Sequence, residues 1–499
     1  MSRNMPSAQM KELVKQVQRT LAGEDNQVQV AEIKHHDGQL LIPNGMSVDA
    51  AIELLERRRD YLEEEVVVTQ AFPVFPYDGA NALAICLEDM FGWAAAEGTP
   101  GFFGKTPPRM ITIEVGPGLT RKIPWGRFSL PGVEGFLQTS VERKHGRIVF
   151  VCHSVVKRNS EATVQALYDR IGAYLNENSI YAGQAIKIRF RDDDGNMLEM
   201  PEPTFLPVEH ISRDMLVYSK DVQDAIETNL FTPIERLADC KANDIPVKRG
   251  VLLGGPYGTG KTMAATVASR LAVDNGVTYL YVPHCDELAD AIEFAKQYER
   301  SACVIFCEDI DRAITGERTV KMDDILNILD GIDTKGAQII TVLTTNHLED
   351  INPAMLRPGR LDAVIDVTAP DAEAVERLVR LYGKGSVAEE TDLTEVGQIL
   401  QGTIPAVIAE VVKRAKLAQL RLQERGTVVE AISAEALVIS AKSMQSQVDL
   451  LAKLSNQQKP EPTFAETLGT ALAPTVERIL NDKLATSVKQ IGEIHQAAC

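Results

Sequence analysis

Apolar residues recur at two different periods along the first 210 residues of this chain, and this mixture predicts both helices and strands. Helical spacing covers 47–65, 80–96 and 160–178, with 6–22 as a short additional helix. Strand-like apolar runs cover 65–72, 110–115, 146–156 and 185–190. Ser47 and Ser160 stand where a helix N-cap is expected. We therefore predict an α+β domain over 40–210, preceded by an N-terminal helix and linker over 1–39.

A different pattern follows the polar segment 191–203, which contains Gly and Pro and is typical of a hairpin turn and linker. Over 211–365 the order is strand, loop, helix, strand, repeated. Such an order predicts a parallel sheet with helices on both faces, which is an α/β fold.

Only helical periodicity remains beyond about residue 366. The expected helices are 371–383, 393–400, 404–423 and 433–454. They predict a small helical lid domain over 366–443 and a helical tail over 444–499. Within the tail, a polar linker at 455–463 precedes an amphipathic helix after Pro474. This last helix is a candidate for oligomerisation or partner binding, and folding back on its own subunit is the alternative.

Composition narrows the class of protein. The chain is 44% hydrophobic and 24% charged, as soluble globular proteins are. Its net charge of −18 argues against a general nucleic-acid coat, which needs a basic face. The seven cysteines form no CxxC pair or metal-ligand cluster. Neither a signal peptide nor a long apolar stretch is found, so we expect a cytoplasmic protein without membrane contact.

The strongest chemical signal is RGVLLGGPYGTGKT at 249–262. A buried strand is followed by Gly-x-x-x-x-Gly-Lys-Thr and then by a helix, which is the P-loop pattern with its required context. Glycines let successive backbone N–H groups point at one anion, and the helix N-terminus adds a positive dipole. Lys261 is predicted to reach the β- and γ-phosphates, and Thr262 to offer its hydroxyl to Mg²⁺. The candidate nucleotide-binding residues are Gly255, Pro256, Tyr257, Gly258, Thr259, Gly260, Lys261, Thr262 and Met263.

Polar residues also end the next apolar strands. VIFCEDID at 304–311 delivers Glu308 and Asp309, and IITVLTTN at 339–346 ends in Asn346. A carboxylate beside a P-loop is what the metal requires, and a polar side chain on the neighbouring strand can orient an attacking water. NPAMLRPGRLD at 352–362 adds two arginines, Arg357 and Arg360.

These residues together resemble the AAA ATPases, in the branch that includes NSF, spastin and the proteasomal ATPases. GPYGTGKT is similar to the family's GPPGTGKT, LRPGRLD to its second region of homology, and ILNILDGID at 325–333 to a family helix. The resemblance covers about 211–443. It implies ATP and Mg²⁺ as ligands and a homo-oligomeric ring, usually a hexamer. It further implies that Asn346 is sensor 1 and that Arg357 and Arg360 are arginine fingers offered to the neighbouring subunit.

The chain departs from the family at three places. The acidic pair is Glu308 then Asp309, in the reverse of the usual order. If the register were shifted so that Glu308 acted as the base, the thiol of Cys307 would occupy the metal position, which suits Mg²⁺ poorly. We therefore place Glu308 at the metal and Asp309 at the water.

The second departure is 284–302, which is short and lacks the aromatic pore-loop triplet of threading relatives. We expect Phe294 and Tyr298 to serve in core packing there. The third is GTIPAVI at 402–408, where Pro405 and Val407 replace residues of the family's sensor 2 stretch.

Three functions are consistent with these features. The first is a ring ATPase that remodels or disassembles a protein complex, with the N-terminal domain binding the substrate or an adaptor. The second is a DNA-associated ATPase, which the acidic balance disfavours, since VERKHGR at 141–147 and VVKRN at 155–159 are only short basic patches. The third is a nucleotide-binding scaffold with weak hydrolysis, motivated by the reversed acids.

Overall fold

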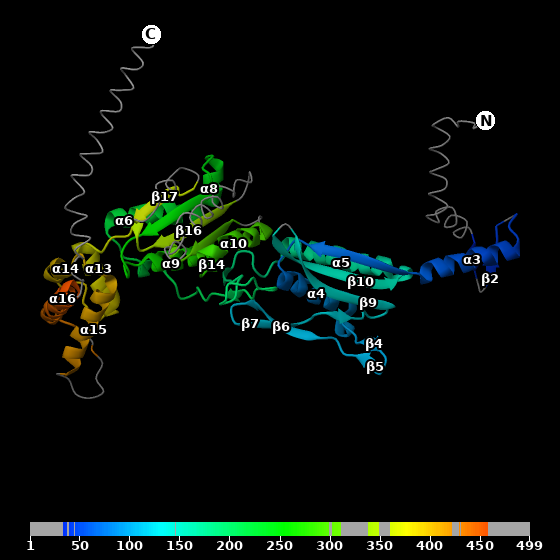
Figure 1. Cartoon of the computed structure of the whole chain (residues 1–499), viewed down its shortest axis with the longest axis horizontal. Helices are drawn as coiled ribbons and strands as arrows, with labels where there is room; N and C mark the ends of the chain where they lie inside the picture. The colour runs from blue at the N-terminus through cyan, green and yellow to red at the C-terminus, as the bar shows by residue number, and fades with distance from the viewer. Residues whose placement is uncertain are drawn as a thin grey trace, which may run out of the picture. The chain divides into compact units, whose positions relative to one another are not determined.

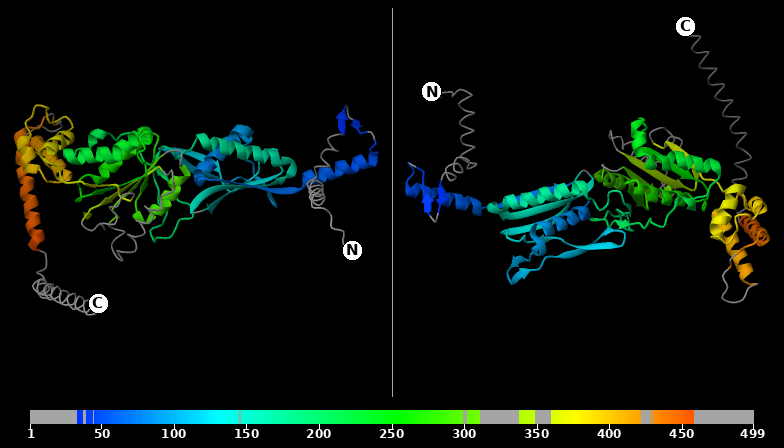
Figure 2. Two further views of the ribbon diagram at one scale, coloured as in Figure 1. Left: turned by 90° about the horizontal axis from the view of Figure 1, so that it is seen from above. Right: turned by 180° about the vertical axis from the view of Figure 1, so that it is seen from behind.

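The computed structural model describes most of the chain between residues 33 and 457 (Figures 1 and 2). The described ranges are 33–36, 39–43, 45–144, 146–298, 302–310, 338–348, 360–421, 429 and 431–457. The expected helix 6–22 and the C-terminal amphipathic helix lie outside them, as does ILNILDGID. Two compact units divide the chain, Met1–Thr368 and Ala369–Cys499.

The N-terminal part of the first unit is an α+β domain, as its mixed periodicity predicts. Its antiparallel sheet has the order β3-β10-β9-β8, and the helices α4 and α5 pack against it (Figure 1). The bounds are β3 Glu65–Phe72, α4 Pro76–Phe91, β8 Arg127–Phe128, β9 Gly135–Lys144, β10 Arg147–Lys157 and α5 Glu161–Glu177. Apolar faces of α4, α5 and the sheet form one core that includes Leu83, Phe150 and Leu167.

Smaller elements surround this sheet. They are the hairpins β1 Lys34–His36 with β2 Gln39–Leu41, β4 Thr99–Gly101 with β5 Gly104–Thr106, and β6 Met110–Gly116 with β7 Leu119–Pro124, together with the helix α3 Val48–Glu63 and the turn η1 Gly92–Ala94. Ser47 caps α3 as predicted, since its side chain accepts a hydrogen bond from the Ala50 N–H. Ser160 precedes α5 but makes no capping bond; its backbone is helical (φ −101°, ψ −4°), whereas an N-cap residue is typically extended.

The central feature of the first unit is a seven-stranded sheet with the order β12-β11-β14-β15-β16-β13-β17. Its strands are β11 Ala185–Lys187, β12 Thr204–Phe205, β13 Arg249–Gly254, β14 Thr278–Val282, β15 Cys303–Cys307, β16 Ile339–Thr345 and β17 Ala363–Asp366. All neighbouring pairs are parallel except β11 with β12. The domain boundary predicted near residue 210 assigns β11 and β12 to the N-terminal domain, whereas the structure places both strands in this seven-stranded sheet. Such short strands, flanking a turn and linker, carry too little pattern to indicate which sheet they belong to.

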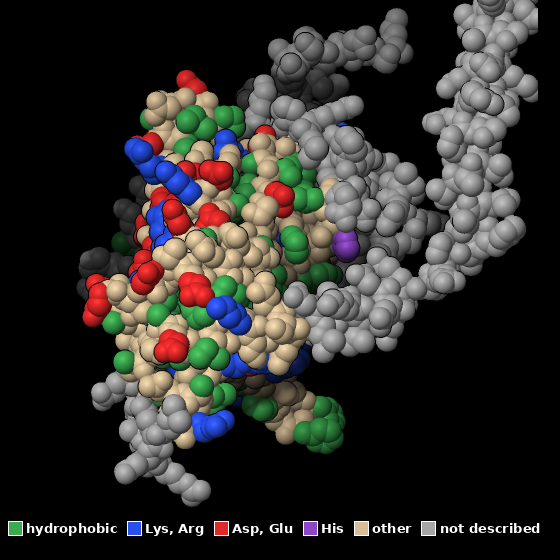
Figure 3. All heavy atoms as spheres, turned by 90° about the vertical axis from the view of Figure 1, so that its left-hand side faces the viewer, with side chains coloured by type: hydrophobic (Ala, Val, Ile, Leu, Met, Phe, Trp, Pro, Cys, Tyr) green, Lys and Arg blue, Asp and Glu red, His purple; other side chains and the backbone are tan. Residues whose placement is uncertain are grey.

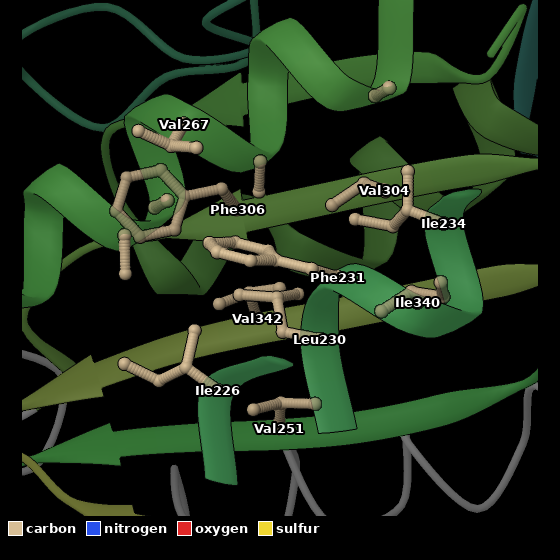
Figure 4. Packing of buried hydrophobic residues seen from close by; sticks show 14 of the residues in the cluster. Ile226, Leu230, Phe231, Ile234, Val251, Val267, Val304, Phe306, Ile340 and Val342 are labelled. Carbon is tan, nitrogen blue, oxygen red and sulfur yellow. The ribbon is translucent and has the colours of Figure 1, made fainter. Parts of the chain in front are cut away.

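Successive residues of the central strands face opposite sides of this sheet. On one face Val251, Val304 and Ile340 meet α9 and the helical segment 220–235 (Figure 4). These helices are α6 Lys220–Ile226, η4 Glu227–Phe231, α7 Thr232–Glu235 and α9 Lys261–Asp274, and the short α8 Leu237–Ala242 follows α7. On the other face Leu252 and Ile305 pack toward α10 Leu288–Ala295. The sheet is therefore covered by helices on both faces, as predicted.

The helix α10 also packs against the N-terminal domain. Phe294 is 3% exposed, and its ring centroid lies 5.2 Å from that of Phe75. Arg147 Nε of β10 donates to Glu293 Oε2 at 3.0 Å, and Gln297 Nε2 donates to the Ile148 carbonyl at 2.8 Å. Tyr298 is likewise buried at 6% exposure and lies 5.3 Å from Phe294. The prediction that Phe294 and Tyr298 serve in core packing is confirmed.

The second unit is helical, as predicted. Its helices are α13 Ala372–Gly383, α14 Thr394–Leu400, α15 Pro405–Arg421 and α16 Ala434–Gln457. Asp371 caps α13 by accepting a hydrogen bond from Ala374 N–H at 2.8 Å. Pro405, which departs from the family pattern, is the first residue of α15, where a proline has no intrahelical N–H bond to lose.

Candidate functional site

The phosphate loop connects the end of β13 to the start of α9. Gly255, Gly258 and Gly260 have φ values of 137°, 80° and 102°, a range that side-chain-bearing residues adopt only with strain. At Gly255 a Cβ atom would also come within 2.4 Å of the Val367 carbonyl oxygen. The glycine spacing is therefore required by both the backbone turn and the close approach of the next chain segment.

Lys261, the first residue of α9, lies inside this loop. Its Nζ donates to the carbonyl oxygens of Gly255 at 2.7 Å and Pro256 at 2.9 Å, and to Asn346 Oδ1 at 2.8 Å. Only 7% of the residue is exposed, so the charge is held in place by the loop and by the end of β16. Thr262, the next residue, is exposed, as is most of the segment Pro256–Gly258.

Asn346 connects the phosphate loop to the acidic pair. Its Nδ2 donates to Asp309 Oδ1 at 3.0 Å while its Oδ1 accepts from Lys261. The β15–β16 and β13–β16 registers pair Cys307 with Leu343 and Gly254 with Thr345, which sets the three strand ends side by side. The structure thus brings Lys261, Asn346 and Asp309 into one hydrogen-bonded group, as their positions after parallel strands predict.

Asp309 has an unusual backbone. Its φ is 48°, in the left-handed region, and its N–H donates to Thr344 Oγ1 at 3.0 Å. Asp and Asn tolerate this conformation better than other side-chain-bearing residues, because their short polar side chains can make local hydrogen bonds. The local backbone therefore favours Asp over Glu at this position.

Glu308 points toward a different neighbour. Tyr281, near the end of β14, donates its hydroxyl to Glu308 Oε2 at 2.9 Å and stacks on Phe306 with ring centroids 5.5 Å apart. Burial raises the pKa of the Tyr281 phenol above its ordinary range, and the hydrogen bond and charge of Glu308 raise it further. The hydroxyl therefore stays protonated at neutral pH and holds one carboxylate oxygen of Glu308 beside β14.

Changing Tyr281 to Phe is expected to raise about 10-fold the Mg²⁺ concentration needed for half-maximal nucleotide binding. This factor is the low end of what a hydrogen bond to a charged group contributes. The ring stacking on Phe306 is retained in this variant, so the fold should be preserved. Mg²⁺ titrations with a fluorescent ATP analogue would measure the effect, and affinity without Mg²⁺ should not change. An unaltered Mg²⁺ titration would mean that Tyr281 does not position Glu308.

The residues predicted to complete the site from another subunit are arranged differently. Arg360 lies beside Gly250 at the start of β13, where a Cβ atom on Gly250 would come within 1.9 Å of the Arg360 carbonyl oxygen. The phosphate loop follows the other end of that six-residue strand. The structure therefore does not bring Arg360 to its own phosphate loop, and Arg357 lies outside the described residues.

Sequence reasoning missed three residues of the site. They are Tyr281, which binds Glu308, Thr344, which binds the Asp309 N–H, and Tyr218. The hydroxyl of Tyr218 donates to the Gly260 carbonyl at 2.7 Å. Thr344 precedes a strand end already singled out, so its place could have been inferred from parallel register. Tyr218 lies 42 positions before Gly260, and no local pattern joins the two.

The donor set suits a nucleotide with Mg²⁺. The loop offers backbone N–H groups and an ammonium to phosphates, and Thr262 with Glu308 offers oxygen ligands to a hard cation. Within the described ranges, no three His, Cys, Asp or Glu side chains gather as a metal-binding group. A nucleotide-bound Mg²⁺ needs no such group, because phosphates and waters supply most of its ligands.

Comparison with known proteins gives the same family over the central region. Residues 251–369 match the model of the ATPase family associated with various cellular activities (AAA). The ATP-dependent zinc metalloprotease FtsH of Mycobacterium bovis is 28% identical over 309 residues, which cover 56% of this chain and 38% of the relative.

Two further relatives are similar to about half of this chain. The cell division cycle protein 48 homolog of Archaeoglobus fulgidus is 28% identical over 278 residues, 51% of this chain and 36% of the relative. The proteasome-activating nucleotidase of Methanococcus vannielii is 27% identical over 247 residues, 46% of this chain and 59% of the relative. The chain thus spans between about a third and three fifths of these relatives.

Proposed function

We propose that this chain, which matches the AAA ATPase family model over residues 251–369, hydrolyses ATP in a ring of identical subunits and uses the energy to remodel or disassemble a protein complex. The hydrogen-bonded group of Lys261, Asn346 and Asp309 is the observation that carries this proposal. It joins Lys261, which can bind phosphate, to two polar side chains that can act on water. A scaffold that only binds nucleotide does not need such a connection.

We assign roles to the residues of this site. Lys261 and the loop from Gly255 to Thr262 bind the phosphates, and Thr262 and Glu308 hold Mg²⁺, which neutralises the developing charge when bound. Asp309 acts as general base toward the attacking water, and Asn346 orients that water. The Asn346 Nδ2 bond to Asp309 supports their acting on the same water, and the Tyr281 bond to Glu308 supports a separate role for that residue.

Assembly is the second part of the proposal. Arg357 and Arg360 act as arginine fingers on the neighbouring subunit's γ-phosphate, as the family resemblance implies. The distance of Arg360 from its own phosphate loop supports this assignment, since a finger that cannot serve its own subunit must serve another. Hydrolysis then requires a ring, and we propose a hexamer.

A protein substrate fits the surface better than DNA does. The net charge is −18, and acidic and basic side chains lie intermixed on the face that Figure 3 shows. The N-terminal α+β domain contacts the ATPase sheet through α10, so it is the part that we expect to hold the client or its adaptor. Among the described helices, none combines the length and apolar character needed to cross a bilayer.

Turnover of ATP by the purified chain tests this proposal directly. We expect measurable hydrolysis that duplex or single-stranded DNA leaves unchanged within about twofold. DNA binding needs a basic surface, and the net charge of this chain is −18. The Lys261→Ala variant serves as the inactive control. A many-fold rise with either DNA would favour the DNA-associated alternative, and absence of turnover in the assembled ring would favour the scaffold.

A further inference from the structure

The hairpin β4–β5 of the N-terminal domain carries two fully exposed aromatic rings at its turn. Phe102 is 96% exposed and Phe103 is 99% exposed, and their ring centroids lie 4.9 Å apart at an interplanar angle of 87°. The hairpin projects from the body of the domain (Figure 1). Two adjacent rings left wholly in water are unfavourable for a free surface, and such patches usually mark interaction sites.

The hairpin has a defined shape that presents these rings. Gly101 pairs with Gly104, so Phe102 and Phe103 form a two-residue turn. Gly104 has φ of 118°, and a Cβ atom on Gly98 would come within 2.6 Å of the Thr106 carbonyl oxygen. These glycines allow a tight approach of the two strands that other residues would prevent.

The base of the hairpin is anchored to the domain. Glu97 and Ser129 exchange backbone hydrogen bonds of 3.1 and 3.0 Å, and Thr99 is buried at 7% exposure. Two prolines, Pro107 and Pro108, follow β5 and restrict the chain that leaves it. The rings are therefore held on a supported element, which lowers the conformational entropy lost on binding.

We propose that this hairpin is a client-binding element that takes an extended, apolar segment of polypeptide. The proposal rests on the function proposed above and identifies the surface that would engage the client. Within the described part of the chain, β4 and β5 pair only with each other. Pro100, the central residue of β4, has no backbone N–H, so the outer edge of β5 is the one that offers both donors and acceptors. An extended peptide can pair with such an edge while its apolar side chains contact the rings.

A membrane fits this surface less well. Lys105, the cation nearest in sequence to the rings, lies 3.3 Å from Glu97, and the chain as a whole carries −18. Anionic bilayers attract basic segments, whereas the single cation of the hairpin, Lys105, is already paired. The unpaired strand edges would also lose their hydrogen bonds to water on entering hydrocarbon. A polypeptide satisfies those groups and lipid does not.

Binding of a short uncharged peptide tests the proposal on the full-length protein. The peptide alternates leucine with serine and carries a fluorescent label, and a matched peptide has serine at every leucine position. Fluorescence anisotropy should detect binding of the leucine peptide only. The double variant Phe102→Ser/Phe103→Ser should bind it roughly 30-fold more weakly or worse, as expected for central aromatic contacts. Leu119 is another exposed apolar residue (64% exposed), at the turn of β6–β7, and the control variant Leu119→Ser should bind as the parent does.

Each alternative outcome overturns the proposal. The first two are that the parent does not bind the peptide, or that the double variant and Leu119→Ser bind it with equal affinity. The third is that the protein binds phosphatidylcholine or phosphatidylserine vesicles in place of the peptide. The fourth is that the double variant changes in particle mass, which would make the tip a subunit contact. Circular dichroism would verify that both variants fold. ATP turnover without peptide is measured in parallel, so intact turnover with failed binding would refute the hairpin assignment alone.

Discussion

Replacing Arg360 with alanine is expected to lower ATP turnover about 10³- to 10⁵-fold while nucleotide affinity changes little. A finger arginine stabilises charge that develops only in the transition state, so its loss appears in kcat. Arg236→Ala is the matched control, because Arg236 is an exposed arginine of the same unit, paired with Asp239.

The position of Arg360 is the reason why we expect this effect to act between subunits. Its carbonyl lies against Gly250, and β13 from Arg249 to Gly254 separates that point from the phosphate loop. At about 3.3 Å per residue, the five steps from Gly250 to Gly255 span roughly 17 Å, which is beyond the reach of one arginine side chain. A subunit therefore cannot supply this arginine to its own nucleotide.

Mixing two inactive variants tests this geometry. Lys261→Ala has a defective phosphate loop and an intact arginine, and Arg360→Ala has the reverse. In mixed rings some interfaces combine an intact loop with an intact arginine, so turnover should reappear in proportion to those interfaces. If the mixture stays as inactive as its components although the subunits co-assemble, the arginine does not act in trans.

Changing Asp309 to Asn is expected to lower kcat about 10²- to 10⁴-fold, which is the usual contribution of a general base. Asn accepts the left-handed backbone at this position as readily as Asp does, so the substitution removes the base without straining the chain. ATP affinity should remain near that of the parent, because Lys261 and the phosphate loop are unchanged. Single-turnover hydrolysis and nucleotide binding measured together would separate these two effects.

The paired variant Glu308→Gln distinguishes the two acids. We expect it to shift the Mg²⁺ concentration needed for turnover, whereas Asp309→Asn should leave that concentration unchanged. Hydrolysis by Asp309→Asn at the parental rate would show that the base has been assigned to the wrong acid. Because a ring stalled with ATP should retain its client, a pull-down with this variant would also recover the substrate.

Much of the fold follows from local pattern. Successive apolar residues, such as Val251 and Leu252, point to opposite faces of a strand, so continuous apolar runs predict a sheet covered on both sides. Residues that follow parallel strands meet at one edge, and on this basis the sequence predicts that Lys261, Asn346 and Asp309 lie together, as they do in the structure.

Several features depend on contacts between distant segments. Tyr281 contacts Glu308 because β14 lies beside β15 in the sheet. The number of residues between them in the sequence does not indicate which side of the sheet the tyrosine faces. β11 and β12 join the ATPase sheet although residues 191–203 read as a linker. The packing of Phe294 against Phe75 likewise joins segments more than 200 residues apart.

The sequence by itself therefore determined the phosphate loop, the two-faced sheet and the order of the acids, since each depends on neighbouring residues and strand period. Only the tertiary structure decided what that order means. The left-handed backbone at Asp309 favours the shorter acid there, and the Tyr281 hydroxyl holds Glu308 apart from it. Both depend on how β14, β15 and β16 align in space, and hydrogen bonds between strands, which no local pattern records, set that alignment.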